Sequence, residues 1–240
     1  MGKKWAGVIL AGGRGSRMGT EVPKQFLTLA GKPMLWHALR AFSDSPVAQI
    51  VLVVPPGEEA HCRKEYAERW GFRKITAVAA GGRERYESAF AGLSALRGSD
   101  CEIVAIHDGA RPLVTPELIV RTCEAAEAHG ACVPAVPVKD TIKAADGENF
   151  AEATLPREKL WAVQTPQTFR YALCMNAYTA MLSGQGAQNG ITDDAMVVER
   201  FSGTRTKLVM GDYRNLKVTT PEDLIAAEAY LSIAAGSFRA

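Results

Sequence analysis

The sequence predicts a three-layer α/β/α fold, in which helices cover both faces of a mostly parallel β-sheet. Two observations lead to this prediction. Short, almost continuously apolar segments recur along the chain, and amphipathic segments with helical periodicity separate them. The chain has 240 residues, 47% of them hydrophobic, which is enough for one α/β domain with a substantial core. In such a sheet, ligands bind beyond the carboxyl ends of the strands, near the point where the strand order reverses.

The predicted elements alternate along the chain. Strands are predicted at residues 5–11, 49–55, 74–80 and 101–107. Helices are predicted at residues 32–45, 57–71, 82–96, 116–129, 171–183 and 221–232. The last helix has a plausible start, with Thr220 as N-cap, Pro221 at the first helical position and Asp223 in the first turn.

Residues 138–158 differ from this pattern. Apolar and polar residues alternate poorly here, and the segment contains the turn signal Asp146-Gly147. We therefore expect a β-hairpin arm that protrudes from the body. The chain shows no Ser/Gly linker, repeat or low-complexity segment. We therefore expect one domain over residues 1–240, with the hairpin inside it. Because the chain stops soon after the last predicted helix, we expect no fused second domain.

Charge and cysteine content restrict the class of protein. Charged residues make up 22% of the chain and the formal net charge is +2, which gives no general case for binding nucleic acid or an anionic membrane. Five cysteines, none in a C-x-x-C pair, favour reduced thiols and a cytoplasmic protein. His129 and Cys132 lack a second ligand pair, so no zinc site is expected. The apolar N-terminal run is too short for a membrane helix and lacks a signal-peptide cleavage site.

A glycine-rich loop, LAGGRGSRMGTEVPKQ at residues 10–25, follows the first predicted strand. It fails the P-loop pattern, because none of its glycines is followed by Lys and then Ser or Thr. Met18 stands where the dinucleotide fingerprint needs its third glycine, and the second strand lacks the acidic residue that grips a ribose. Ser16 is one position out of register for a hydrolase nucleophile elbow.

What remains is a glycine turn with three cations, Arg14, Arg17 and Lys24. Glycine allows backbone N–H groups to approach an anion closely, and the cations add charge. Arginine can grip phosphate oxygens bidentately, whereas lysine acts as a point charge. The alternative is that these cations are solvated surface residues. Their clustering in one glycine turn at a strand end favours phosphate binding.

The loop resembles the signature of nucleotidyltransferases that join a nucleoside triphosphate to a phosphorylated small molecule. Six further motifs follow it in order: GGRERYES (81–88), HDGARP (107–112), PVKDTIK (137–143), LWAVQTPQTF (160–169), TDDA (192–195) and LKVTTPEDL (216–224). Together they resemble the 2-C-methyl-D-erythritol 4-phosphate cytidylyltransferase family of the non-mevalonate route to isoprenoids. The resemblance covers nearly the whole chain and implies a Rossmann-like nucleotidyltransferase fold.

The resemblance also implies roles for individual residues. Arg17 and Lys24 would stabilise the pentavalent transition state at the α-phosphate of CTP, and Lys217 would be a catalytic phosphate ligand near the reacting centre. The implied nucleotide-binding residues are Ala11, Gly12, Gly13, Gly15, Gly82, Arg85, Ser88 and Asp108. The implied acceptor-binding residues are Arg111, Thr141, Arg157, Thr165 and Lys217. Mg²⁺ would be bound mainly through the CTP phosphates, without a set of protein ligands.

The partners implied by the resemblance are CTP, a small sugar-alcohol phosphate and a second copy of the chain. Thr141 and Arg157 would reach the acceptor phosphate from the hairpin of the second subunit in a homodimer. A cytidylyltransferase for another polyol phosphate, such as ribitol 5-phosphate, shares much of the pattern and stays open at this point. Met18, in place of the third glycine of the fingerprint, argues against a dinucleotide-binding oxidoreductase. A non-catalytic nucleotide-binding regulator would be expected to lose Arg17 or Lys24, and both are present.

Some polar residues have structural alternatives. Adjacent strand residues point to opposite faces of a sheet, so His107 and Asp108 are expected to act separately, with His107 as a structural residue. Asp108 could be a ligand or a turn residue before Gly109. Of Asp193 and Asp194, at least one is expected to cap a helix.

Overall fold

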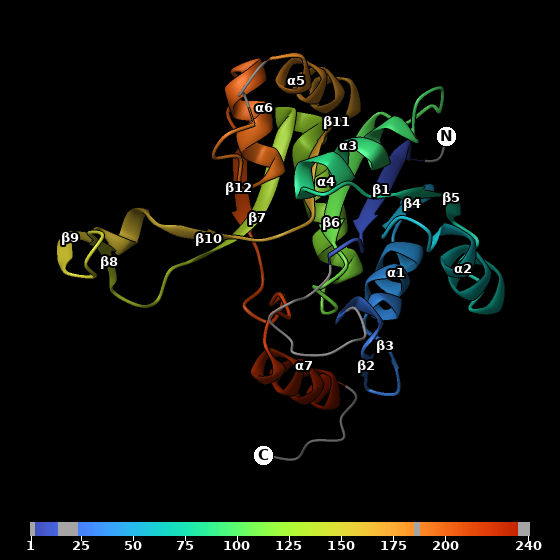
Figure 1. Cartoon of the computed structure of the whole chain (residues 1–240), viewed down its shortest axis with the longest axis horizontal. Coiled ribbons are helices and arrows are strands. Elements are labelled where there is room, and N and C mark those ends of the chain that lie inside the picture. Colours follow the sequence, from blue (N-terminus) through green and yellow to red (C-terminus); the bar gives the residue numbers. More distant parts are fainter. Residues whose placement is uncertain (1–2, 14–23, 185–187, 235–240) are drawn as a thin grey trace.

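A computed structural model of the chain describes residues 3–13, 24–184 and 188–234. Its centre is a sheet in the order β10-β7-β11-β6-β1-β4-β5, and β12 also pairs with β7, on the edge opposite β10 (Figure 1). The strands are β1 (Trp5–Leu10), β4 (Gln49–Val54), β5 (Ile75–Ala80), β6 (Ile103–Asp108), β7 (Ala131–Pro137), β10 (Trp161–Val163), β11 (Gln167–Arg170) and β12 (Lys207–Met210). The predicted three-layer architecture with a mostly parallel sheet is confirmed.

The four predicted strands form one half of this sheet. β1 pairs in parallel with β4 and β6, and β5 pairs in parallel with β4. The residues of β1, β4 and β6 are almost all buried, as expected for strands covered on both faces, whereas those of β5, at the sheet edge, are mostly part-exposed. In the other half, β11 runs antiparallel to both β6 and β7. From β1 the chain adds β4 and β5 on one side and then crosses to the other side of β1 to form β6. The strand order therefore reverses between β1 and β6, and a ligand is expected beyond the carboxyl ends of these two strands.

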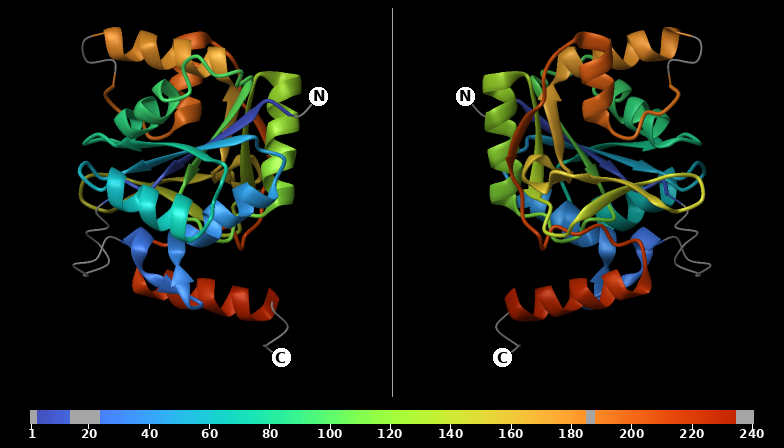
Figure 2. Two further views of the ribbon diagram at one scale, coloured as in Figure 1. Left: turned by 90° about the vertical axis from the view of Figure 1, so that its right-hand side faces the viewer. Right: turned by 90° about the vertical axis from the view of Figure 1, so that its left-hand side faces the viewer.

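Helices cover the two faces of the sheet (Figure 2). One face carries α1 (Met34–Asp44), α2 (Glu59–Cys62) with the π-helical segment η3 (Arg63–Arg69), and α4 (Pro116–His129). The other face carries α3 (Arg85–Ser94), α5 (Tyr171–Ser183) and α6 (Asp194–Ser202). A separate apolar cluster lies on each face and supplies most of the buried hydrophobic area, which is the main stabilising term of such a fold. All the predicted helices are present, and α6 is the helix that the expected cap at Asp193 or Asp194 begins.

A smaller cluster packs α7 (Pro221–Ala234) against the short strand β2 (Thr28–Leu29), which pairs with β3 (Lys32–Pro33). The side chain of Thr220 accepts a hydrogen bond from the backbone N–H of Asp223 at 3.4 Å, which confirms the predicted N-cap. The helix lies at the lower edge of the molecule, next to β2 (Figure 1). This cluster supports the segment 215–220, which carries Lys217 to the functional site.

The predicted hairpin is present as β8 (Ile142–Ala145) paired antiparallel with β9 (Ala151–Leu155), and the short helix η4 (Arg157–Lys159) follows it. Its turn is longer than a two-residue Asp-Gly turn. The carboxylate of Asp146 accepts hydrogen bonds from the backbone N–H groups of Glu148 and Phe150, both at 2.9 Å. The arm extends away from the body (Figure 1). Within the described parts of the chain, no helix is long and apolar enough to cross a membrane.

Candidate functional site

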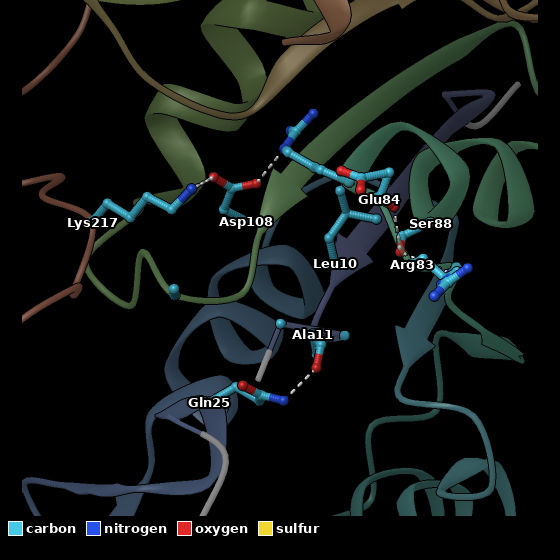
Figure 3. Close-up of a pocket in the computed structure, with 13 residues that line it drawn as sticks. Leu10, Ala11, Gln25, Arg83, Glu84, Ser88, Asp108 and Lys217 are labelled. Carbon is cyan, nitrogen blue, oxygen red and sulfur yellow. Dashed lines mark hydrogen bonds and ion pairs between the residues drawn. The ribbon is translucent and has the colours of Figure 1, made fainter. Parts of the chain in front are cut away.

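An open cavity of about 210 Å³ lies beyond the carboxyl ends of β1 and β6, at the switch point of the sheet. The start of α3 and the segment before α7 complete its walls (Figure 3). Predicted nucleotide-binding residues and Lys217 gather here: Ala11, Gly12, Gly13, Gly82, Arg85, Ser88 and Asp108 line the cavity with it. Residues about 200 positions apart in the chain therefore form one site.

The loop after β1 provides one wall of this cavity. Gly12 and Gly13 line it with their backbone, so an anion can approach the chain closely here. The predicted residues Gly15 and Arg17 lie outside the described residues, as does the side chain of Lys24. Lys24 begins the short helix η2 (Lys24–Phe26).

Gln25 connects that helix to the end of β1. Its side chain is 2% exposed and its amide donates a hydrogen bond to the carbonyl of Ala11 (Figure 3). This contact holds η2, and with it the backbone of Lys24, beside the glycine loop. Gln25 is the last residue of the quoted loop sequence, and no local pattern distinguishes it there from a surface glutamine.

The amino-terminal end of α3 forms the opposite wall. Glu84 and Glu87 make a reciprocal capping box, so the first backbone N–H groups of the helix are satisfied. The hydroxyl of Ser88 accepts a hydrogen bond from the N–H of Gly82 at 3.1 Å. A side chain at Gly82 would place its Cβ 2.3 Å from the Cβ of Glu87, so the close approach here requires glycine. Ser88 and Gly82 are thus held together, as their predicted common role requires.

A chain of alternating charges crosses the floor of the cavity. Asp108, at the end of β6, pairs through one carboxylate oxygen with Lys217 at 2.7 Å and through the other with Nε of Arg85 at 3.1 Å. Arg85 in turn donates two hydrogen bonds, each of 2.8 Å, to the two oxygens of Asp194. Burial opposes the charge of Asp108, but the charges of Arg85 and Lys217 outweigh it and hold the pKa of this carboxyl far below its usual range. Asp108 is therefore a charged group that fixes two cations, and not merely a turn residue.

His107 points away from this cavity and is fully buried. The hydroxyl of Thr165 accepts from the N–H of Asp108 and donates to Nδ1 of His107 at 3.0 Å, so Nε2 carries the proton donated to the carbonyl of Arg111. Burial lowers the pKa of His107 to about 4. His107 is a neutral structural residue, as predicted, and it ties together the backbone of the HDGARP motif.

A second cavity of about 160 Å³ adjoins the first on the other side of Asp108. Arg111 and Thr165, both predicted to bind the acceptor, line it together with Arg85, Asp108 and Lys217. The guanidinium of Arg111 is held by a 2.7 Å hydrogen bond to the carbonyl of Asn215. Lys217, which is 38% exposed, thus lies at the boundary between the two cavities.

The remaining two predicted acceptor ligands lie elsewhere. Thr141 and Arg157 belong to the arm, and neither lines either cavity. Both are exposed, and Arg157 donates a 3.0 Å hydrogen bond to the carbonyl of Lys139 at the base of the arm. The structure therefore separates these two residues from the site of their own chain, as the predicted contribution to a second subunit's site requires.

The amino-terminal end of α6 contacts the site through Arg85. The side chain of Asp193 accepts from the backbone N–H of Met196 at 2.9 Å, which confirms the predicted helix cap. Asp194 is fully buried and accepts a hydrogen bond of 2.5 Å from the hydroxyl of Tyr178. Neither Asp194 nor Tyr178 was predicted to belong to the site. The TDDA motif was the only signal that could have directed attention to Asp194.

The side chains that line the cavity suit a metal ion that is held mainly by a bound substrate. Among the described residues, no cluster of three or more His, Cys, Asp or Glu side chains could hold a metal. The carboxylates lining the first cavity are those of Asp108 and Glu84, of which Glu84 serves as a helix cap. Mg²⁺ typically binds one or two carboxylates, several waters and substrate phosphates, so Asp108 could supply at most a single protein ligand.

Comparison with known proteins gives one family. The model of the family "2-C-methyl-D-erythritol 4-phosphate cytidylyltransferase" matches residues 6–233. A protein of this name from Pelotomaculum thermopropionicum is 50% identical over 97% of the chain and 96% of its own length. Another from Caldanaerobacter subterraneus is 45% identical over 93% of the chain and 97% of its own length.

Solved structures agree with these sequence matches. The 4-diphosphocytidyl-2C-methyl-D-erythritol synthase from Anaerococcus prevotii superposes with a TM-score of 0.81 at 31% identity, over 97% of this chain and 100% of its own. The 2-C-methyl-D-erythritol 4-phosphate cytidylyltransferase from Thermus thermophilus gives a TM-score of 0.75 at 33% identity, over 93% and 97% of the two chains.

Proposed function

The chain belongs to the 2-C-methyl-D-erythritol 4-phosphate cytidylyltransferase family, and we propose that the site described above carries out the reaction of that family. The enzyme transfers CMP from CTP to the phosphate of 2-C-methyl-D-erythritol 4-phosphate and releases pyrophosphate. The named relatives act on this acceptor, so ribitol 5-phosphate, the alternative left open by the sequence, is not favoured.

One observation carries the assignment of roles. Two adjoining cavities share Lys217, Asp108 and Arg85 at their common boundary. We assign CTP to the first cavity, beside the glycine loop, and the acceptor to the second, beside Arg111. The acceptor phosphate then meets the α-phosphate of CTP at this boundary, where Lys217 can contact both.

The chemistry explains why cations dominate the site. A phosphate acceptor already carries an oxyanion nucleophile, so no side chain needs to generate one. The difficulty is to bring this anion to an anionic triphosphate and to stabilise the pentavalent transition state. A unit charge pair at about 4 Å is worth roughly 4 kcal/mol at an effective dielectric constant of 20. Arg17 and Lys24 from the loop and Lys217 from the boundary between the two cavities are the proposed sources of that stabilisation.

Mg²⁺ is the proposed metal, held mainly by the phosphates of CTP, and among the described residues Asp108 is the carboxylate proposed to assist. The ion would neutralise part of the triphosphate charge when bound. Lys217 and Arg85 already occupy the two oxygens of Asp108, which agrees with a metal that depends on its nucleotide. Chelation by EDTA should therefore abolish turnover without lowering the melting temperature of the ligand-free protein.

A homodimer formed through the arm is the proposed active assembly. Arg157 and Thr141 are exposed on the arm and remote from the cavities of their own chain. Apolar side chains are also exposed on the arm and at the adjacent sheet edge: Phe150 (68%), Leu155 (37%), Trp161 (37%) and Val163 (40%). Such exposure is typical of a surface that a partner covers. We propose that the partner's arm brings its Arg157 to the acceptor phosphate.

A cytoplasmic location is proposed as well. All five cysteines are buried free thiols, and burial raises the pKa of each of them, which leaves little reactive thiolate at neutral pH. This chemistry suits a reducing compartment.

Phosphorus NMR of the reaction mixture tests the proposed function. With CTP, 2-C-methyl-D-erythritol 4-phosphate and Mg²⁺, the acceptor's monophosphate signal should disappear. A diphosphate that joins cytidine to the acceptor and free pyrophosphate should appear in equal amounts. Release of inorganic phosphate, or CTP hydrolysis to CMP without a linked product, would exclude transfer to the acceptor.

A further inference from the structure

The buried ion pair beneath the site has no assigned role in the reaction. Asp194, the first residue of α6, is fully buried and receives both terminal nitrogens of Arg85 at 2.8 Å. The hydroxyl of Tyr178 donates to one of the same oxygens at 2.5 Å. A bidentate arginine–carboxylate pair has a fixed geometry, so Asp194 dictates the orientation of the guanidinium.

Asp194 is itself held in place by the fold. The neighbouring Asp193 accepts a hydrogen bond from the amide of Gln167 at 2.9 Å, and the other end of that amide accepts from the N–H of Ala195 at 2.9 Å. Gln167 lies in β11 and is 2% exposed. The amino-terminal end of α6 is thereby fastened to the central sheet on both sides of Asp194.

This arrangement limits what Arg85 can offer to Asp108. Both terminal nitrogens face Asp194, and only the Nε–H is directed at one oxygen of Asp108. The second oxygen of Asp108 is left for Lys217. Without Asp194, the two terminal nitrogens of Arg85 could turn to Asp108 and compete for the oxygen that holds Lys217.

We infer that Asp194, braced by Tyr178, is a positioning residue for the transfer reaction. It orients Arg85 so that Asp108 keeps one oxygen free to place Lys217 at the boundary of the two cavities. Its influence on the reaction passes through Lys217, although Asp194 contacts neither the cavity nor Lys217. The kinetic part of this inference rests on the proposed function, whereas the geometric part does not.

A double-mutant cycle between Asp194 and Lys217 tests the inference. Asp194→Asn should lower kcat by about 5- to 100-fold, within the range found for coupled neighbouring groups, and change the KM for CTP less than kcat. In a Lys217→Met background, the same Asp194→Asn change should lower kcat less than about 2-fold, because the residue through which it acts is gone. An equal loss in both backgrounds would show a merely structural role and overturn the inference, and so would an unchanged kcat in the single variant.

Two further variants protect the test against misfolding. Tyr178→Phe removes one hydrogen bond and no charge, and it should show a smaller loss with the same dependence on Lys217. Glu199→Gln removes an exposed charge from the same helix and should leave kcat unchanged. If Asp194→Asn fails to fold, the cycle with Tyr178→Phe decides, and additivity there overturns the inference.

Nuclear magnetic resonance of the arginine side chains separates this inference from the proposed function. The Nε–H of Arg85, hydrogen-bonded to Asp108, should give a protected signal in the unmodified protein, and Asp194→Asn should shift that signal or remove its protection. An unaltered Arg85 signal in Asp194→Asn would overturn the inference whether or not the enzyme turns over. Absence of turnover in the unmodified protein would instead contradict the proposed function.

Discussion

The ammonium group of Lys217 lies 2.7 Å from the carboxylate of Asp108, at the boundary between two cavities (Figure 3). Asp108 comes from the end of a central strand, and Lys217 comes from the segment before the last helix. The strand is rigid, so Asp108 gives the flexible lysine a fixed partner. A phosphate arriving at the boundary then meets a cation that is already in position, which reduces the reorganisation needed in the transition state.

Replacing Lys217 should therefore affect the reaction more than the fold. Lys217→Met should lower kcat by about 10²–10³, as expected for loss of one preorganised group that stabilises developing charge. Its effect on the melting temperature should be small, because Asp108 keeps its pair with Arg85. Lys64→Met, an exposed lysine on η3, is the matched control and should retain full activity. A Lys217→Met enzyme with near-normal kcat would remove this residue from the reaction.

Mixing two inactive variants tests whether the arm serves a second subunit. Lys24→Ala disables the site of its own chain, and Arg157→Ala should disable the site of its partner. After unfolding and refolding together, half of the dimers are mixed, and one of the two sites in each has both residues intact. About a quarter of the unmodified activity should return, as the symmetry of a two-fold dimer requires.

The alternative gives a different result in the same experiment. If Arg157 served its own chain, each mixed dimer would still contain two disabled sites, and activity would stay at the level of the separate variants. Steady-state pyrophosphate release before and after mixing provides the measurement.

The apolar tip of the arm should stabilise the dimer. Phe150 is 68% exposed in the single chain, and burying a phenylalanine against a partner is worth about 1.5–3 kcal/mol. Phe150→Glu should raise the dimer dissociation constant by roughly 10- to 100-fold, measured by analytical ultracentrifugation. Ile225→Glu, at an equally exposed position (69%) on α7, is the control and should leave the dissociation constant unaltered. Equal effects of the two substitutions would argue against an arm-mediated dimer.

His107 should make the fold sensitive to mild acid. Its pKa is about 4 in the folded protein and ordinarily 6.5, so the unfolded chain binds a proton below pH 6.5 that the folded chain excludes. Stability should fall as the pH drops from about 6.5 to 4, by about 3 kcal/mol from this residue at 1.36 kcal/mol per pKa unit. In His107→Gln, urea unfolding measured across this range should show a flatter pH dependence, with a residual slope from His37, whose pKa burial also lowers. A slope identical to that of the unmodified protein would show that His107 does not titrate on unfolding.

The helices and strands that have a clear local pattern of apolar and polar residues were predicted from the sequence. The strands around the site are continuous apolar runs, and the helices have clear periodicity and caps, as at Thr220 and Asp193. β7 was not predicted, because Pro134 and Pro137 interrupt its pattern. It still forms a central strand, since three other strands pair with it and supply the contacts that local propensity does not.

The site was predictable only in part, for a related reason. Motifs identified Asp108, Arg85 and Lys217 as members of the site, but not that they form one chain of charges. Asp194 pairs with Arg85 across 109 residues of sequence, and its burial depends on how α6 packs against the sheet. Gln25 is similar, since its side chain contacts the carbonyl of Ala11, 14 positions earlier in the sequence. Pairings of this kind arise from tertiary structure and leave no local pattern.

The most direct test of the central claim is pyrophosphate release measured with CTP, UTP, ATP and GTP, each with 2-C-methyl-D-erythritol 4-phosphate and with ribitol 5-phosphate. Our account predicts rapid release with CTP and the methylerythritol phosphate, and much lower kcat/KM for every other combination. No release with CTP and either acceptor would contradict it.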